Sequence, residues 1–318
     1  MTLKTIILDT DIGTDVDDCL ALALCLASSE LKLTAVTTVY GDTQLRARMV
    51  LKLLALRGVN AVPVAAGAEK PLLDRGPVYW EGHEGQGLLT PEDSALAPVT
   101  EHASDLIARV AMARPGEIIL IAIGPLTNIA VAMLKEPRLA RALGGLVIMG
   151  GVVGGTGALH LPWTEHNFRA DPEAAQIVLA SGAPIAIVPL DVTTQVRIRP
   201  VGVARLAAAD TPFHVAVANQ VRQYPPYRDR GWTYLHDPLA VATVIRPELF
   251  RWESLHAVVE AGGTHTAGKL LVKLPSESTP ATAEVALGVN VAPAEAFIIG
   301  RLAQPGSSAE QPLTSPAS

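Results

Sequence analysis

The chain of 318 residues is poor in cysteine and in charged residues. Its two cysteines, Cys19 and Cys25, lie in an apolar segment and form no CxxC pair, so neither a disulfide nor a thiolate metal site is expected. Charged residues make up 18% of the chain against 49% apolar residues, and no stretch has the composition of a linker. We therefore predict two buried, reduced thiols and one enzyme-sized domain over residues 1–303, followed by a disordered tail over 304–318.

Basic clusters and long apolar runs are also missing. With a net charge of −6 and no cluster of Lys and Arg, the chain has nothing to neutralise a phosphate backbone, which argues against a nucleic-acid surface. The apolar runs are shorter than a membrane-spanning helix, and the apolar run before Asp9 is too short for the core of a signal peptide. We expect a cytoplasmic protein without a membrane partner that binds a small molecule.

Strand-like and helix-like segments alternate along the chain. Short apolar or β-branched runs that indicate strands occur at 4–8, 33–39, 117–123, 146–149 and 184–189. Helical patterns occur at 17–27, 44–57, 126–134 and 172–180. This alternation predicts an α/β, Rossmann-like single domain with a mostly parallel central sheet and helices on both faces. Shorter strands are expected from about residue 254, within 256–262, 268–274 and 283–291, before a last helix over 292–302.

Five aspartates crowd into DTDIGTDVDD at residues 9–18, directly after the first predicted strand. Open α/β sheets bind ligands in the loops at the carboxyl ends of their strands. Clustered carboxylates are costly unless protons or a cation compensate their charge, and hard oxygen ligands favour Ca²⁺ or Mg²⁺. The segment therefore predicts a divalent cation site. The plainer alternative is that Asp17 and Asp18 cap the following helix while the other three face water.

Three other chemistries use comparable loops. An EF-hand needs glycine at its sixth position, but Gly13 is fifth from Asp9 and third from Asp11, so that hypothesis fails. A dinucleotide site needs G-x-G-x-x-G, whereas the glycines over 144–157 have other spacings and are more typical of a mobile or ligand-covering loop. A phosphatase of the haloacid dehalogenase type stays open, with Asp9 as nucleophile and Asp11 as acid.

Two further polar clusters lie later in the chain. In HLPWTEHNFRADPEAA, Glu165 and Asn167 would project to one side of an extended segment, where they could hold adjacent hydroxyls of one sugar. The alternative for this cluster is solvation of the loop, with Asp171 capping the next helix. In HDPLA, Asp237 before a proline is typical of a helix N-cap. His236 beside it is a candidate general acid.

Five motifs occur together in this chain: DTDIGTDVDD, TTVYGD, AIGPLTNIA, EHNFRADPEAA and HDPLA. Their order and approximate spacing resemble the inosine/uridine-type nucleoside hydrolases, which are Ca²⁺-dependent N-ribohydrolases, over about residues 4–300. The resemblance implies an enzyme of purine or pyrimidine salvage and nucleoside catabolism that hydrolyses ribonucleosides to free base and ribose. It also implies a homodimer or a homotetramer.

The resemblance implies a role for each matching position. Asp11 would be both a Ca²⁺ ligand and the base that activates the attacking water. Asp18 would be a bidentate Ca²⁺ ligand, and Asp237 and the backbone carbonyl of Ile123 would complete the protein ligands.

The resemblance also assigns residues to the substrate. Asp17 would bind the 2′-hydroxyl, and Glu165 and Asn167 would hold the ribose on its other side. Asp42 stands near the ribose, where the family usually has asparagine. His236 would lie near the leaving base and help to protonate it.

Several positions depart from the family pattern. D-I-G-T-D-V-D-D is two residues longer than the usual D-x-G-x-D-D, which leaves Asp15 without a role. Leu159 stands where a sugar-binding asparagine is often found, and Glu81 stands at a usual histidine position with His83 nearby. The sequence therefore does not fix the preferred base. A non-catalytic nucleoside- or ribose-binding protein is the alternative from a different class.

Overall fold

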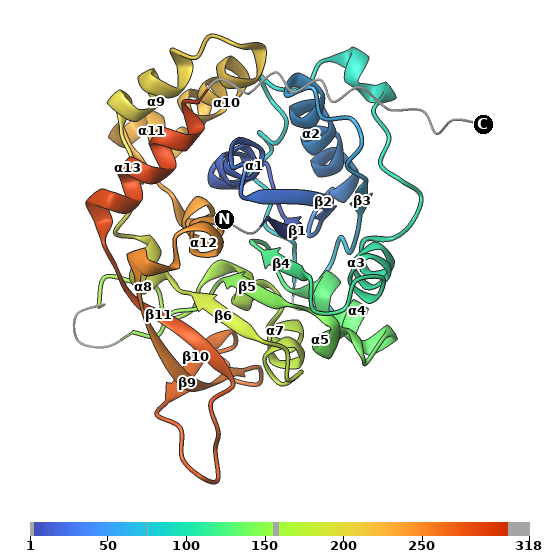
Figure 1. The fold of residues 1–318 in the computed structure, drawn as a ribbon, viewed down its shortest axis with the longest axis vertical. Helices are drawn as coiled ribbons and strands as arrows, with labels where there is room; N and C mark the ends of the chain where they lie inside the picture. Colours follow the sequence, from blue (N-terminus) through green and yellow to red (C-terminus); the bar gives the residue numbers. More distant parts are fainter. Residues whose placement is uncertain (1–2, 75, 155–158, 305–318) are drawn as a thin grey trace.

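A single central sheet of nine strands organises the computed structural model, which describes residues 3–74, 76–154 and 159–304 (Figure 1). Its strand order is β10-β9-β11-β6-β5-β4-β1-β2-β3. Neighbouring strands from β11 through β3 are parallel, while β9 is antiparallel to both β11 and β10. The strands are β1 Lys4–Thr10, β2 Leu31–Thr38, β3 Val64–Ala66, β4 Ile118–Ala122, β5 Gly145–Met149, β6 Ile185–Val188, β9 Phe250–Glu260, β10 Lys269–Lys273 and β11 Ala283–Val289. A separate two-stranded ribbon consists of β7 Arg197–Ile198 and β8 Thr233–Tyr234.

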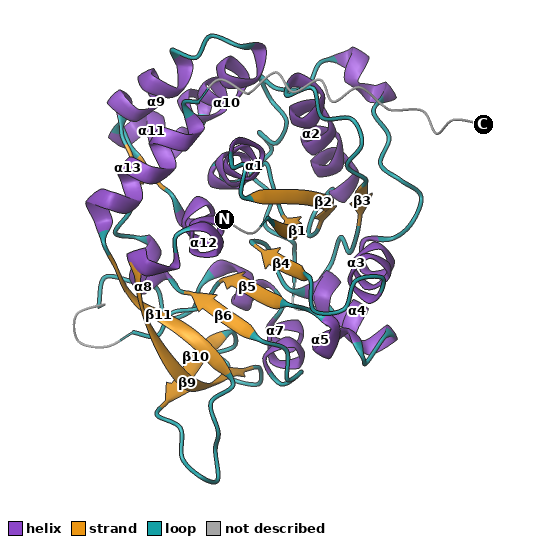
Figure 2. Cartoon of the chain, viewed as in Figure 1, coloured by secondary structure: helices purple, strands orange, loops and turns teal. Residues whose placement is uncertain are grey.

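Helices cover both faces of the sheet, as Figure 2 shows. One face carries α1 Asp17–Ala27, α2 Thr43–Leu56, α9 Pro200–Ala207, α10 Pro212–Gln223, α12 His236–Ile245 and α13 Val291–Leu302. The other face carries α3 Ala103–Met112, α4 Thr127–Lys135, α5 Leu139–Ala142 and α7 Pro172–Leu179. Shorter helices near the loops are α6 His166–Ala170, α8 Leu190–Thr193 and α11 Pro225–Arg230.

The alternation of side chains along β1 produces two apolar cores. Ile6 and Leu8 face the core that contains α1 and α12, whereas Ile7 faces the core that contains α3 and α4. Because both faces of the strand are buried, its sequence is a continuous apolar run. None of the helices in the described residues is long and apolar enough to span a membrane.

The predicted fold class is confirmed, and the exceptions are local. The strand predicted at 146–149 is confirmed as β5, Gly145–Met149, so only part of the glycine-rich segment 144–157 can be the loop that its glycine spacing indicated, and residues 155–157 lie outside the described part. The antiparallel region begins earlier than expected, because β9 starts at Phe250. The predicted disordered tail falls, except for Gln304, outside the described residues.

The order of the strands reverses between β1 and β4. From β1 the chain moves to β2 and β3 on one side, whereas β4 pairs with the other edge of β1 and leads to β5 and β6. Such a switch point leaves a crevice at the carboxyl ends of the two strands, where ligands bind in open α/β sheets. The acidic loop follows β1 and Ile123 follows β4, so the topology brings both to this crevice.

Candidate active site

A cavity of about 520 Å³ opens at this switch point. Segments from distant parts of the chain line it, and several residues that the sequence singled out are among them. They are Asp11, Asp15, Asp17, Asp18, Glu81, His83, Ile123, Glu165, Asn167, His236 and Asp237.

The carboxylate cluster lies on one wall of the cavity. Oxygens of Asp17, Asp18 and Asp237 lie within 4.8 Å of one another, and all three side chains are buried. Burial is the main reason that the pKa of each lies well above its usual value, and the neighbouring carboxylates raise it further. Burial likewise raises the pKa of Asp11. These groups cannot all be ionised without a compensating positive charge.

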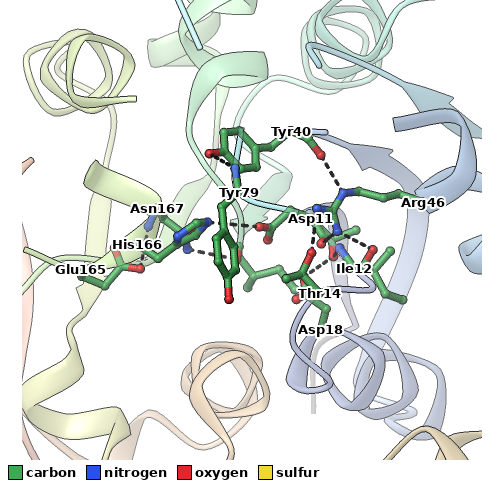
Figure 3. Close-up of polar contacts among 12 residues, drawn as sticks. Asp11, Ile12, Thr14, Asp18, Tyr40, Arg46, Tyr79, Glu165, His166 and Asn167 are labelled. Atoms are coloured by element: carbon green, nitrogen blue, oxygen red, sulfur yellow. Dashed lines mark hydrogen bonds and ion pairs between the residues drawn. The ribbon is translucent and has the colours of Figure 1, made fainter. Parts of the chain in front are cut away.

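The backbone around the cluster is held by a buried arginine. Arg46 Nε donates to the carbonyl of Tyr40 at 2.6 Å, and Nη1 donates to the carbonyls of Asp11 and Ile12 (Figure 3). Its guanidinium charge lowers the pKa of Asp11 and Asp18, which partly offsets the effect of burial. No sequence motif pointed to this arginine, which lies on α2 far from the acidic loop in sequence.

The donor set fits a hard divalent cation. Asp17, Asp18 and Asp237 are the one group of three or more candidate metal-ligating side chains found in residues 3–74, 76–154 and 159–304, and all its ligand atoms are carboxylate oxygens. Thr10 Oγ1 donates to Asp18 Oδ1 at 2.5 Å, and the Asp237 amide donates to Asp17 Oδ2 at 3.2 Å, so these carboxylates are already oriented. The cluster can therefore hold a metal ion.

Glu165 and Asn167 lie across the cavity, but not in the extended segment that was predicted. Glu165 is the N-cap of α6: Oε1 accepts from the Asn167 amide at 2.7 Å, and Oε2 accepts from the amides of Gly151 and Phe168. Asn167 lies in the first turn of that helix. Its Nδ2 donates to the Ile123 carbonyl at 3.1 Å, which couples the amide to the carbonyl predicted as a metal ligand.

His236 and Asp237 begin α12, and the structure corrects the predicted cap. The N-cap is Leu235, and Asp237 lies inside the first turn with its side chain in the carboxylate cluster. His236 lines the cavity, and its Nδ1 lies 2.7 Å from Thr193 Oγ1. Burial lowers the pKa of His236 to about 4, so the imidazole is neutral near pH 7.

Asp42 and Leu159 are not among the described residues that line the cavity, so the structure does not place Asp42 where the family resemblance put it. Asp42 is exposed, and its carboxylate caps α2 by accepting from the Leu45 amide at 2.8 Å. Leu159 is 85% exposed. The loop after β2 turns the Asp42 side chain into the start of α2.

The phosphatase alternative requires an accessible Asp9, and the structure buries this residue completely. Its Oδ1 accepts from Thr37 Oγ1 and from Asn128 Nδ2 at 2.8 Å, and burial raises its pKa to about 7. Asp9 is not one of the described residues that line the cavity. A nucleophile in this position has no access to a substrate, which argues against the phosphatase mechanism.

Sequence reasoning missed a histidine beside Asp11. His166 lines the cavity, and its Nε2 lies 3.9 Å from Asp11 Oδ2 (Figure 3). The rings of Tyr40 and Tyr79 pack edgewise on it, with centroids 5.7 and 5.9 Å away. Its place between Glu165 and Asn167 in the sequence could have indicated that it lies near the site.

Asp15, which had no role from the sequence, lines the cavity together with Tyr224. Asp15 Oδ1 accepts from the Val16 amide at 2.6 Å. Burial chiefly raises the pKa of Tyr224, and the charge of Asp15 adds to this effect. Asp15 therefore helps to keep the hydroxyl of Tyr224, the N-cap of α11, in its protonated form.

The fold and the site define a class of α/β protein whose mostly parallel sheet has, at its switch point, a cavity with a cluster of buried carboxylates that can hold a metal ion. Comparison with known families narrows the class. The family model described as inosine-uridine preferring nucleoside hydrolase matches residues 6–296. The chain therefore belongs to this family of hydrolases that act on N-glycosyl compounds, as the resemblance of its motifs indicated.

Known relatives agree on the family and differ in the base they prefer. The pyrimidine-specific ribonucleoside hydrolase RihA of Citrobacter koseri is 35% identical over 277 residues, 84% of this chain and 87% of that protein. The non-specific ribonucleoside hydrolase RihC of Salmonella agona is 36% identical over 291 residues, 90% and 93% of the two chains. The structure of a purine-preferring ribonucleoside hydrolase from Gardnerella vaginalis matches this one with a TM-score of 0.84 at 30% sequence identity. The match covers 94% of this chain and 98% of that one.

Proposed function

We propose that this protein hydrolyses the N-glycosidic bond of ribonucleosides to free base and ribose, with Ca²⁺ as its metal. The observation that carries the proposal is the buried cluster of carboxylates in the same cavity as Glu165, Asn167 and His236. We further propose, from the family resemblance alone, a cytoplasmic homodimer or homotetramer.

By the family resemblance, the residues that would hold Ca²⁺ are Asp11, Asp18, Asp237 and the carbonyl oxygen of Ile123, so that Asp11 would take the place that Asp17 has beside Asp18 and Asp237 in the group of closely spaced oxygens. Their oxygens match the preference of this ion. Bound there, the ion would supply the positive charge that the buried carboxylates need and would lower the pKa of water at the site. Asp17 is then left to accept a hydrogen bond from the ribose 2′-hydroxyl.

The residues opposite the cluster would orient the sugar. Asn167 Nδ2 is committed to the carbonyls of Ile123 and Met149, so its Oδ1 is the atom that would accept from a ribose hydroxyl. The Glu165 carboxylate fixes the helix that carries this amide, and it lines the cavity itself. Holding the hydroxyls in place lowers the entropic barrier to attack at C1′.

The chemistry consumes one water. Asp11 takes a proton from the water that attacks C1′, while the C1′–N bond breaks and its electron pair leaves with the base. The sugar passes through an oxocarbenium-like transition state, and His236 stabilises the departing base by donating a hydrogen bond. The departing base then takes a proton from solvent and Asp11 returns its proton to solvent, so that one nucleoside and one water give ribose and free base. Attack from the face opposite the base implies inversion at C1′, by analogy with glycosidases.

Two single substitutions test this assignment. Asp11→Asn removes the base, so we expect kcat for ribonucleosides to fall by about 10²–10⁴. Asp9→Asn alters a residue behind the cavity and should retain most of the activity. Base release is measured for both variants, phosphate release from a phosphate ester is measured beside it, and thermal unfolding confirms that both are folded.

The opposite pattern would contradict the assignment. Phosphate release that is lost only in Asp9→Asn would support the phosphatase. A wild-type protein that binds nucleosides in calorimetry but releases no base would support the non-catalytic alternative.

A further inference from the structure

The segment PLDVTT after β6 contains a buried threonine behind His236. Thr193 is the last residue of α8 and has no exposed surface. Its Oγ1 lies 2.7 Å from His236 Nδ1, within hydrogen-bond distance. Thr193 is not among the described residues that line the cavity, whereas His236 is. The threonine can therefore act on a substrate only through the histidine.

The contact also determines which ring nitrogen carries the hydrogen. A buried hydroxyl needs an acceptor for its hydrogen, and His236 Nδ1 is the one side-chain partner that the described residues give to Thr193 Oγ1. If Nδ1 were protonated, it would donate to Oγ1 and leave the hydroxyl hydrogen without that acceptor. The arrangement in which Thr193 donates to Nδ1 satisfies both groups and leaves the hydrogen of the imidazole on Nε2.

A second contact limits rotation of the same ring. The ring of Tyr234 lies 4.9 Å from the imidazole between centroids, at an angle of 42°. Tyr234 belongs to β8, and its own ring contacts Trp232 at 4.9 Å. With Thr193 holding one nitrogen and Tyr234 packed against the ring, the imidazole is fixed in the cavity wall.

We propose that Thr193 is a positioning residue of the reaction: its hydroxyl fixes the tautomer and orientation of His236 so that Nε2–H donates to the leaving base. The inference rests on the proposed function, because it assumes that His236 faces the leaving base of a ribonucleoside and assigns Thr193 as the residue that orients it. The hydrogen bond helps the base to accept the electron pair of the C1′–N bond as that bond breaks. Asp11 and the attacking water lie outside this arrangement.

The experiment compares Thr193→Val with Thr193→Ser on two substrates. Val has the shape of Thr without the hydroxyl, and Ser keeps the hydroxyl. One substrate is a ribonucleoside such as uridine or inosine, whose base needs a hydrogen-bond donor to leave. The other is 4-nitrophenyl riboside, whose leaving group is a stable anion that needs none. Binding of Ca²⁺ to each variant is measured by calorimetry.

For Thr193→Val we expect kcat on the ribonucleoside to fall about 10–100-fold, as for other residues that orient a functional histidine, with little change in KM. Thr193→Ser should recover most of this loss. Hydrolysis of 4-nitrophenyl riboside and binding of Ca²⁺ should stay close to wild type in both variants. Thr193→Cys, which keeps the volume but is a weak donor, replaces the valine variant if that variant does not fold, with the same expected loss.

A Thr193→Val enzyme as fast as wild type on ribonucleosides would overturn the inference. An equal loss on both substrates, or an equal loss for Val and Ser, would also overturn it, because either result indicates a packing role. These outcomes require an active wild-type enzyme. A wild-type protein that releases no base from ribonucleosides contradicts the proposed function instead.

Discussion

The buried carboxylates of the cavity differ in what surrounds them. The guanidinium of Arg46 lowers the pKa of Asp11 and Asp18, whereas the first-turn aspartates Asp17 and Asp237 have mainly carboxylates as charged neighbours. Burial is the largest cause of the raised pKa in all four groups. The positive charge of Arg46 favours the ionised form of Asp11, which suits a residue that must accept a proton.

The burial of the two cysteines leads to a separate prediction about their reactivity. Cys19 and Cys25 are free and buried on α1, as the sequence predicted, and burial raises the pKa of each to about 12. Because the thiolate is the reactive form, we expect the native protein at pH 8 not to react with Ellman's reagent, and both thiols to react in denaturant. Rapid reaction of the native protein would contradict this burial.

Among the structural elements, α7 depends on one side chain. Asp171 is its N-cap and accepts from the Ala174 amide at 3.0 Å, as the capping alternative predicted. The other carboxylate oxygen accepts from the Leu72 amide at 2.8 Å and from Thr127 Oγ1 at 2.6 Å. One fully buried carboxylate thus ties α7 to α4 and to the loop after β3.

Removing this carboxylate should destabilise the whole fold. The cap contributes about 1 kcal/mol, and each of the other two hydrogen bonds contributes about 1 kcal/mol, so Asp171→Ala should lower the free energy of unfolding by about 3 kcal/mol. Urea unfolding measures this change. Gln176→Ala, at an exposed position on the same helix, is the matched control and should change it by less than about 0.5 kcal/mol. Equal losses in both variants would show that Asp171 does not tie these elements together.

Prediction of the elements from sequence succeeded for much of the central sheet and for the helix after β1, but it missed α3 and several later helices. The helix Asp17–Ala27 was predicted with its observed bounds, because its apolar run starts at two aspartates. The helices α9, α10 and α11 were missed, although each begins with a proline, at Pro200, Pro212 and Pro225. A proline in the first turn is typical of helix starts, so this signal was present in the sequence.

At the scale of the whole molecule, the sheet topology brings the site together. The motifs after β1 and β4 meet because the ends of these two strands lie at one switch point, and the motif at the start of α12 lines the same cavity. The alternation of strands and helices in the sequence predicted the parallel sheet that brings such loops together. The orientation of individual side chains was not predictable. Asp42 turned into a helix cap, and Thr193 lies behind His236, because each contact depends on tertiary packing.

We propose above that the carboxylate cluster at this switch point binds Ca²⁺ and that ribonucleoside hydrolysis depends on it. The most direct test is base release from a panel of purine and pyrimidine ribonucleosides by chelator-treated protein to which Ca²⁺ is added back in steps. We predict no base release in chelator and a rate that rises with Ca²⁺ until a single site is filled. Equal base release in chelator, or no base release from any nucleoside at saturating Ca²⁺, would contradict the account.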